Sequence, residues 1–413
     1  MSIENSKLDI CLTGKTPAAE NSSLTRWPII VSAVLIQICL GAIYSWGVFL
    51  SPLMSSFGVN KTRVSLAFSL ALIFYTVGMI IGGKWQDKVG PLRVITASGF
   101  LIGAGYILTG FSGSIEMIYL TYGVLGGIGL GLGYICPVAV CAKWFPDKKG
   151  MAIGLAVAGF GAGSLIVAPI ASFLITVAGW RWTFIGLGML FGLIILIAGS
   201  FMNNPPRNLS SGLNLAKNEP TGEGIDWKKM FKTKQFRYFW TIFALLASAG
   251  LMFISHLPDF IKGLKFSRDV GPLLLGVLSI SNGLGRILLG AISDKFGRLN
   301  ILLLTALQLG LTLLLITKVA YFPLLVLFCI LAGLSFGGII AIFPILAADH
   351  FGSKNLGLNY GLLFTAYGIG GIIGPTIGAV VFDLWRNYSN AFFTGGLFSL
   401  TALILIVVVK KRV

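Results

Sequence analysis

Long apolar stretches separated by short polar segments recur along the whole chain. About twelve of them have helical length, at residues 27–50, 62–82, 93–112, 117–142, 150–178, 182–202, 237–261, 271–291, 299–317, 321–347, 358–382 and 390–409. About 20 apolar residues are enough for a helix to cross a hydrocarbon core of ~30 Å. The alternation of polar and apolar residues that is typical of membrane barrel strands does not occur. The pattern therefore predicts an all-α membrane protein with twelve transmembrane helices.

Composition and charge agree with this prediction and orient the chain. The 413 residues are 56% hydrophobic and only 11% charged, with a net charge of +17. If both termini are cytoplasmic, the inner segments hold 22 of the 31 Lys and Arg residues and the outer loops hold 8. This asymmetry is the positive-inside signature. We therefore expect a multi-pass protein of the cell (inner or plasma) membrane with both termini in the cytoplasm, and no nucleic-acid partner.

The chain repeats itself at an offset of 207 residues. The segment Gly83–Gly90 (GKWQDKVG) reappears as Gly290–Gly297 (GAISDKFG). The same offset relates several glycines and a proline: Gly126 and Gly333, Gly131 and Gly338, Pro137 and Pro344, Gly150 and Gly357, Gly154 and Gly361, and Gly161 and Gly368. Two parallel six-helix repeats place a substrate site near the membrane midplane, between the halves.

The repeat also divides the chain into segments. We expect a disordered cytoplasmic tail (1–25), an N-terminal six-helix bundle (26–202), a cytoplasmic linker (203–236), a C-terminal six-helix bundle (237–409) and a short cytoplasmic end (410–413).

Arg286 lies inside the apolar stretch Gly276–Gly290, eight residues before Asp294. At about 1.5 Å per residue it lies roughly 12 Å from the watery end of its helix, near the midplane. A buried guanidinium there needs a polar partner, and a small anion is the natural one. Asn282, four residues earlier, shares its helix face, so both side chains can hold one carboxylate. The alternative is that Arg286 only ties its helix to neighbouring carbonyl groups.

Three motifs resemble a known family. The repeated Gly-x-x-x-Asp-Lys-x-Gly segments are similar to the loop motif of the major facilitator superfamily. Residues Gly41–Trp46 (GAIYSW), Lys143–Gly150 (KWFPDKKG) and Asn359–Gly361 (NYG) resemble the oxalate:formate antiporter family, which is related to the monocarboxylate transporters. The resemblance implies a secondary transporter of small carboxylates that works by alternating access. It also implies that Arg286 binds the substrate carboxylate.

The resemblance further assigns a gating role to the repeated loops, whose acids form inter-helix salt bridges and helix caps. The residues concerned are Gly83, Asp87, Gly90, Gly290, Asp294 and Gly297.

Two positions depart from the related transporters. Where the oxalate:formate antiporter has a second buried cation, a lysine, this chain has Tyr367. One cation cannot neutralise two carboxylates, and an unpaired buried charge is costly, so we expect a monocarboxylate substrate. Where animal monocarboxylate transporters have an aspartate, this chain has Asn282. A proton relay through that position is therefore excluded.

Aromatic residues lie at the depth of Arg286 or near the outer mouth. Tyr134 and Phe160 are each about 15 Å from an inner helix end. Together with Tyr367, they predict a small, half-apolar pocket for a short acid with a hydroxyl or keto group. Phe336 and Tyr44 are further candidates for its lining. The alternative for all five is helix packing alone.

Titratable candidates for proton coupling are few. His256 and Asp259 lie near the outer end of their helix, and histidine changes charge near neutral pH. The alternative is a solvated residue at the mouth.

These observations predict a carrier of a small monocarboxylate of the lactate or pyruvate type, driven by a proton or by exchange with another carboxylate. Oxalate/formate exchange is the nearest alternative, and a non-transporting membrane sensor is an alternative of another class. With two histidines and 14 acids, no catalytic cluster can be assembled, so we do not expect an enzyme. We also expect no cofactor and no metal, and a monomer in the bilayer.

Overall fold

The structure, a computed structural model, describes residues 17–205, 224–264, 266–267, 270–385 and 387–411. In this part of the chain all regular elements are helical, and 11 helices are long and apolar enough to cross a membrane. The longest, α8 (Lys149–Gly199), is broken at Gly179, whose φ of +79° and ψ of 163° are not helical. It therefore holds two of the predicted spans, and the all-α, twelve-span prediction is confirmed.

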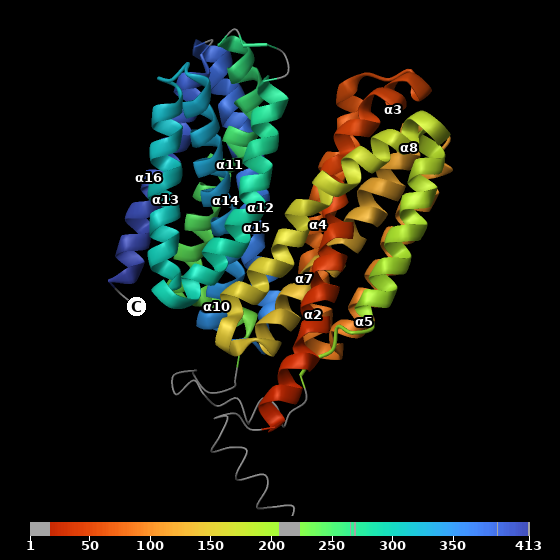
Figure 1. Ribbon diagram of the computed structural model, residues 1–413, viewed down its shortest axis with the longest axis vertical. Coiled ribbons are helices and arrows are strands. Elements are labelled where there is room, and N and C mark those ends of the chain that lie inside the picture. Colours follow the sequence, from red (N-terminus) through yellow and green to blue (C-terminus); the bar gives the residue numbers. More distant parts are fainter. Residues whose placement is uncertain (1–16, 206–223, 265, 268–269, 386, 412–413) are drawn as a thin grey trace, which may run out of the picture.

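Figure 1 shows two groups of helices side by side. The N-terminal bundle comprises α2 (Pro17–Gly41), η1 (Ala42–Phe49), α3 (Leu50–Phe57), α4 (Lys61–Val89), α5 (Pro91–Gly110), α6 (Ile115–Ile118), η2 (Tyr119–Gly126), α7 (Gly127–Trp144), η3 (Pro146–Lys148) and α8. The C-terminal bundle comprises α11 (Lys234–Gly263), α12 (Val270–Phe296), α13 (Arg298–Ile316), α14 (Phe322–Phe351), α15 (Leu356–Trp385) and α16 (Tyr388–Lys410). The short helix α10 (Trp227–Lys232) lies between them in sequence.

The first and fourth spans are not uniform α-helices. The first passes from α2 through the 3₁₀ segment η1 into α3. The fourth contains the π-helical segment η2, a rare form that often marks functional sites. Helix α2 begins at Pro17, inside the segment 1–25 that the sequence predicts as a tail, and residues 1–16 lie outside the described residues.

Glycines at repeated positions end the second and eighth spans. Gly90 and Gly297 both have φ of +87°, a conformation that a residue with a Cβ rarely adopts. The chain can therefore turn from α4 into α5, and from α12 into α13, within one residue at each place.

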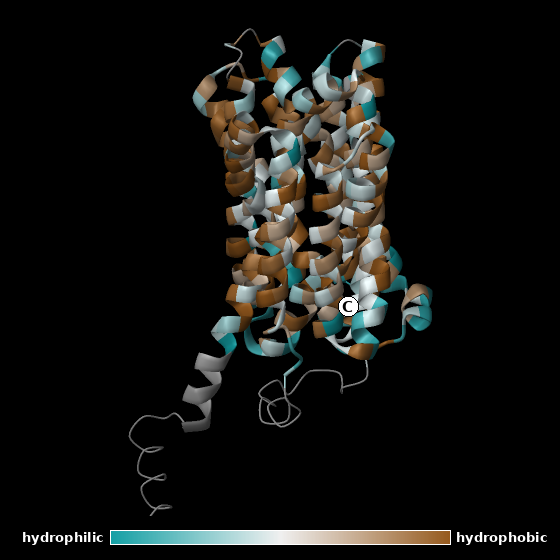
Figure 2. Ribbon diagram, turned by 90° about the vertical axis from the view of Figure 1, so that its right-hand side faces the viewer, coloured by the Kyte–Doolittle hydropathy of each residue, from teal (hydrophilic) through white to brown (hydrophobic). Residues whose placement is uncertain are grey.

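Apolar residues cover the middle of the helices, and polar residues gather at both ends (Figure 2). Large apolar side chains face outward there, including Phe100, Phe173 and Ile372, each more than 60% exposed. Such exposure suits contact with lipid tails. The chain is a multi-pass membrane protein.

The bundles meet at one end and diverge toward the other (Figure 1). The end where they meet also carries α10 and the C-terminal end of α16, and we call it the linker end; the opposite end is the far end.

Candidate functional site

Arg286 lies on α12, and its side chain is held in place by two hydrogen bonds. It is 5% exposed. Its Nε donates to Oδ1 of Asn282, one turn earlier, at 3.0 Å. Its Nη1 donates to the backbone oxygen of Val157 at 2.7 Å. Val157 belongs to α8, so this second bond joins the two bundles.

The guanidinium is only partly satisfied by the protein. A guanidinium has five N–H donors. In the described part of the chain, the two bonds above are its only protein hydrogen bonds, and no carboxylate lies within ion-pair distance. The remaining donors on Nη1 and Nη2 are therefore available to an anion.

Glycines on α8 explain why a backbone oxygen can reach Arg286. A Cβ at Gly154 would overlap the carbonyl oxygen of Arg286, so only glycine permits this approach of α8 to α12. Gly161, two turns further along, leaves space beside the guanidinium. A Cβ there would lie 3.5 Å from Cζ of Arg286, at ordinary contact distance.

A cluster of aromatic rings extends across the boundary between the bundles. In the N-terminal bundle the ring of Phe160 contacts those of Tyr44, Tyr75 and Tyr134, at centroid distances of 5.5, 6.1 and 5.1 Å. Phe364 of α15 contacts Tyr134 and Tyr75 at 5.8 and 5.6 Å, and so links the two halves.

The cluster continues into the C-terminal bundle and toward the far end. The ring of Phe364 stacks on Tyr367 at 4.9 Å and contacts Tyr360 at 5.7 Å. The hydroxyl groups of Tyr44 and Tyr367 lie 3.4 Å apart, one from each bundle. Tyr44 is carried on the 3₁₀ segment η1 and is 40% exposed.

Arg286 and the cluster belong to one site. Val157, whose backbone oxygen accepts from Arg286, and Gly161, which lies beside the guanidinium, flank Phe160 of the cluster on α8. The structure therefore brings together Arg286, Asn282, Tyr134, Phe160, Tyr367 and Tyr44, and their role in substrate binding stays a prediction.

Other predicted residues lie elsewhere. Phe336 packs against Gly250 of α11, inside the C-terminal bundle, and makes no ring contact with the cluster among the described residues. Nε2 of His256 lies 3.0 Å from the backbone oxygen of Pro375, and its ring packs beside Tyr388. Asp259 is exposed on α11. Among the described residues, none of these three side chains makes a hydrogen bond, ion pair or ring contact with Arg286.

Sequence reasoning missed several residues of the site. Tyr75, Tyr360 and Phe364 are buried parts of the cluster. Gln37 of α2 is fully buried, and its Nε2 donates to the backbone oxygen of Tyr134 at 3.3 Å, while its Oε1 has no hydrogen-bond partner among the described residues. The only signal for the aromatic residues was their depth in the predicted helices, which packing residues share.

The repeated loops make reciprocal contacts at the linker end. Asp294 accepts hydrogen bonds from the N–H groups of Gly150 and Met151 at 2.9 and 3.0 Å, at the start of α8. Asp87 accepts from the N–H groups of Gly357 and Leu358 at 3.2 and 2.9 Å, at the start of α15. Each bundle therefore caps a helix of the other, where the helix dipole favours a negative charge.

Glycine is required at both contacts. A Cβ at Gly83 would overlap Gly357, and a Cβ at Gly150 would overlap Gly290. These pairs are also related by the offset of 207. The gating role of the loops stays a prediction, but the contacts give it a physical basis.

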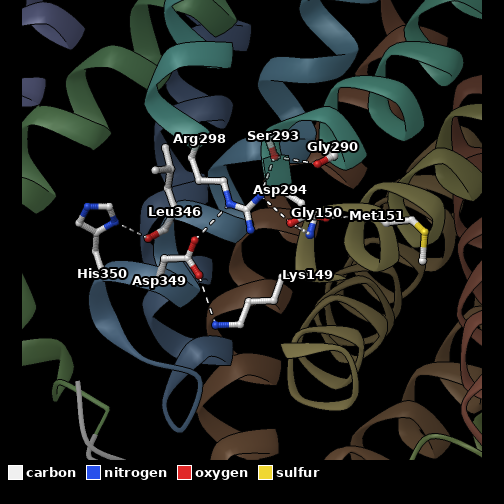
Figure 3. A network of polar contacts seen from close by, with 10 residues as sticks. All are labelled: Lys149, Gly150, Met151, Gly290, Ser293, Asp294, Arg298, Leu346, Asp349 and His350. Carbon is white, nitrogen blue, oxygen red and sulfur yellow. Dashed lines mark hydrogen bonds and ion pairs between the residues drawn. The ribbon is translucent and has the colours of Figure 1, made fainter. Parts of the chain in front are cut away.

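Ion pairs reinforce the contact between α8 and α12 (Figure 3). Arg298 pairs with Asp294 at 2.6 Å and with Asp349 at 3.2 Å. Lys149, on the other bundle, pairs with Asp349 at 3.2 Å and is 6% exposed. The α8–α12 contact is thus held by charges as well as by a cap.

The site can bind and orient a small anion. It offers one cation, several phenol groups and apolar rings. Within the described residues no group of three or more His, Cys, Asp or Glu residues could hold a metal.

Comparison with known proteins agrees with this geometry. The sequence profile of the Major Facilitator Superfamily matches residues 31–317 and 272–413. The chain is 30% identical to an uncharacterized MFS-type transporter, YhjX, of Escherichia coli, over 85% of this chain and 87% of that protein. It is 28% identical to the oxalate:formate antiporter of Oxalobacter formigenes, over 94% and 92%.

More distant matches are of the same kind. The chain is 25% identical to monocarboxylate transporter 12 of Xenopus laevis, over 90% of this chain and 85% of that protein. Among solved structures it resembles the proton:xylose symporter XylE, with a TM-score of 0.71 at 15% identity, over 93% of this chain and 95% of that one. This last likeness concerns the fold alone.

Proposed function

We propose that this chain, which belongs to the major facilitator superfamily, transports small monocarboxylates of the lactate or pyruvate type by alternating access. The observation that carries the proposal is Arg286. It is 5% exposed, lies where the two bundles meet, and keeps N–H donors free for an anion. Burying such a charge in a membrane is costly unless an anion binds beside it. A role in helix packing alone therefore explains the buried guanidinium poorly.

The presence of one cation in the candidate site supports a monocarboxylate as the substrate. Arg286 and Lys149 are the buried Lys and Arg residues of the described chain, and Lys149 pairs with Asp349 at the linker end. Tyr367 stands where the resemblance to the oxalate:formate antiporter calls for a lysine. A dicarboxylate would leave one charge without a partner in this pocket. The relatives named as monocarboxylate transporters favour the same substrate class.

The arrangement of contacts supports alternating access. The cross-bundle caps and ion pairs of Asp87, Asp294 and Lys149 lie at the linker end, so the described conformation is closed there. Transport requires a second conformation in which these contacts are broken. By the positive-inside rule we assign the linker end and both termini to the cytoplasm of a cell membrane.

Two mechanisms are candidates for driving transport of the carboxylate. A proton carried by His256 is the first, with Asp259 as its alternative. Exchange with a second carboxylate is favoured by Asn282, because an amide cannot neutralise Arg286 as an aspartate would. An empty carrier would have to reorient with an unneutralised buried guanidinium that loses its bond to Val157 as the bundles move. Reorientation with a bound carboxylate avoids this penalty.

Uptake into proteoliposomes tests the proposal. Labelled lactate, pyruvate, formate and oxalate are compared with and without a pH gradient, and with and without internal unlabelled acid. Arg286→Lys keeps the charge but loses the planar fork, and we expect at least a tenfold loss of uptake with unchanged insertion. Arg237→Lys, at an exposed position on α11, is the matched control and should leave uptake unchanged. Near-normal uptake by both Arg286→Lys and Arg286→Gln would refute the proposal.

A further inference from the structure

The short helix α10 is fixed to the C-terminal bundle at the linker end. Its side chain Met230 is fully buried. Just before the helix, the N–H group of Ile225 donates to the backbone oxygen of Phe351 at 2.9 Å, and its oxygen accepts from Nδ2 of Asn359 at 2.9 Å. Thr233 alone separates α10 from the transmembrane helix α11. The helix is therefore held at the level where a transmembrane helix enters the bilayer.

The exposed sides of α10 are aromatic and basic. At about 100° per residue, Trp227 and Phe231 lie on one side, next to Met230. They are 38% and 44% exposed, and their rings contact each other at 6.3 Å. Lys228 and Lys232 lie on the next side around the helix and are also exposed. The ammonium group of Lys228 lies 5.7 Å from the ring of Trp227.

The basic surface continues across a cavity of about 160 Å³ at the edge of α10. Its lining is Lys84, Asp87, Lys88, Asp226, Trp227, Asn355 and Leu358. Both lining carboxylates accept hydrogen bonds from backbone N–H groups, Asp87 from α15 and Asp226 from Lys228. In the described chain, neither Lys84 nor Lys88 has a carboxylate within ion-pair distance.

We propose that α10, with Lys84 and Lys88 across the cavity, binds the headgroups of anionic phospholipids in the adjoining leaflet. Tryptophan and phenylalanine beside a basic helix face are typical of segments that lie in the membrane interface. The phosphate groups meet the lysines, and the two rings lie among the acyl chains next to them. Because Met230 and Ile225 fix the helix, this surface is in place before lipid arrives.

Lipid retention measures this binding without reference to transport. The purified protein is placed in nanodiscs of phosphatidylcholine mixed with phosphatidylglycerol, and the lipids that it retains are identified by native mass spectrometry. A lysine near an anionic surface changes affinity about fivefold. We therefore expect Lys228→Gln/Lys232→Gln to reduce the preference for phosphatidylglycerol by tenfold or more.

A matched control removes two charges from the same end of the molecule. Lys410→Gln/Lys411→Gln, on exposed residues at the end of α16, should retain the preference. Trp227→Phe should lower the quenching of tryptophan fluorescence by brominated phosphatidylglycerol. An equal loss of preference in the α16 control, or no loss in the α10 variant, would overturn the proposal. So would binding of polyglutamate that the α10 variant loses, because the surface would then serve an acidic protein.

Discussion

Replacing Asp294 with Asn tests whether the reciprocal caps hold the linker end closed. In the native protein both carboxylate oxygens accept backbone N–H groups of α8, and one of them pairs with Arg298 at 2.6 Å. Asparagine has one acceptor oxygen, so it loses one cap bond and the ion pair. A hydrogen bond to a charged group is worth about 1.5–3 kcal/mol. The pair with Arg298 lies within the C-terminal bundle, so it is not broken when the bundles separate and its loss does not favour opening.

The change should therefore favour opening of the linker end by about 1.5–3 kcal/mol, or roughly tenfold or more in the equilibrium constant. Asp87→Asn likewise loses one cap bond between the bundles, so it should have a similar effect. Spin labels at the exposed positions 88 and 354, one on each bundle, report the separation by electron paramagnetic resonance. The native caps should give a single short distance, and Asp294→Asn should add a longer one.

Two results would refute this reasoning. The first is an unchanged distance distribution in Asp294→Asn. The second is an unchanged distance distribution in Asp87→Asn, because the two caps would then not contribute equally to closure. Labels at Met117 and Tyr321, toward the far end, provide the control, since a true gate change should shorten that distance as the other one lengthens.

Substitutions at Tyr367, His256 and two glycines of α8 test the substrate site and the coupling of transport. Tyr367→Lys adds a second cation, so it should strengthen competition by oxalate and weaken lactate binding. Tyr367→Phe should reduce the favourable free energy of lactate binding by only about 0.5–1.5 kcal/mol. Better binding of oxalate than lactate by the wild type would contradict the single-cation argument. If a proton drives transport through His256, His256→Gln should flatten the pH dependence of uptake between about pH 5 and 8, and an unchanged profile would leave exchange as the coupling mode. Gly161→Ala adds a methyl group beside the guanidinium without overlap and should reduce substrate affinity at unchanged thermal stability, whereas Gly154→Ala should destabilise the protein. Gly276→Ala, with nothing within 4 Å of its added methyl group, is the control for both in uptake and thermal-unfolding assays.

Much of the fold could be predicted from the sequence because its signals are local and repeated. The apolar runs correspond to helices, and the offset of 207 marks residues that form equivalent contacts. Gly83 and Gly290 are examples, since each lies against a glycine of the opposite bundle. Arg286 was recognisable because a lone cation in an apolar run has few explanations.

The rest of the site depends on features that cannot be predicted from the residue types in the sequence. The partner of Arg286 on α8 is a backbone oxygen, and any residue at position 157 would supply it. Tyr75 and Phe364 are aromatic residues in apolar helices, where such residues are common. Lys149 and Asp349 have no charged equivalents at the offset, which pairs them with Leu356 and Ala142. Repeat symmetry therefore could not reveal their ion pair.

The crossed caps have a consequence for how the molecule is assembled. Asp87 of the first half contacts Gly357 of the second, and Asp294 of the second contacts Gly150 of the first. Contacts of this reciprocal kind define an isologous interface, the arrangement found where two identical subunits are related by a two-fold axis. The linker end is thus built like the interface of a homodimer whose subunits are covalently joined. Lys149 and Asp349 are additions to that interface on one side only, where the two-fold symmetry no longer holds.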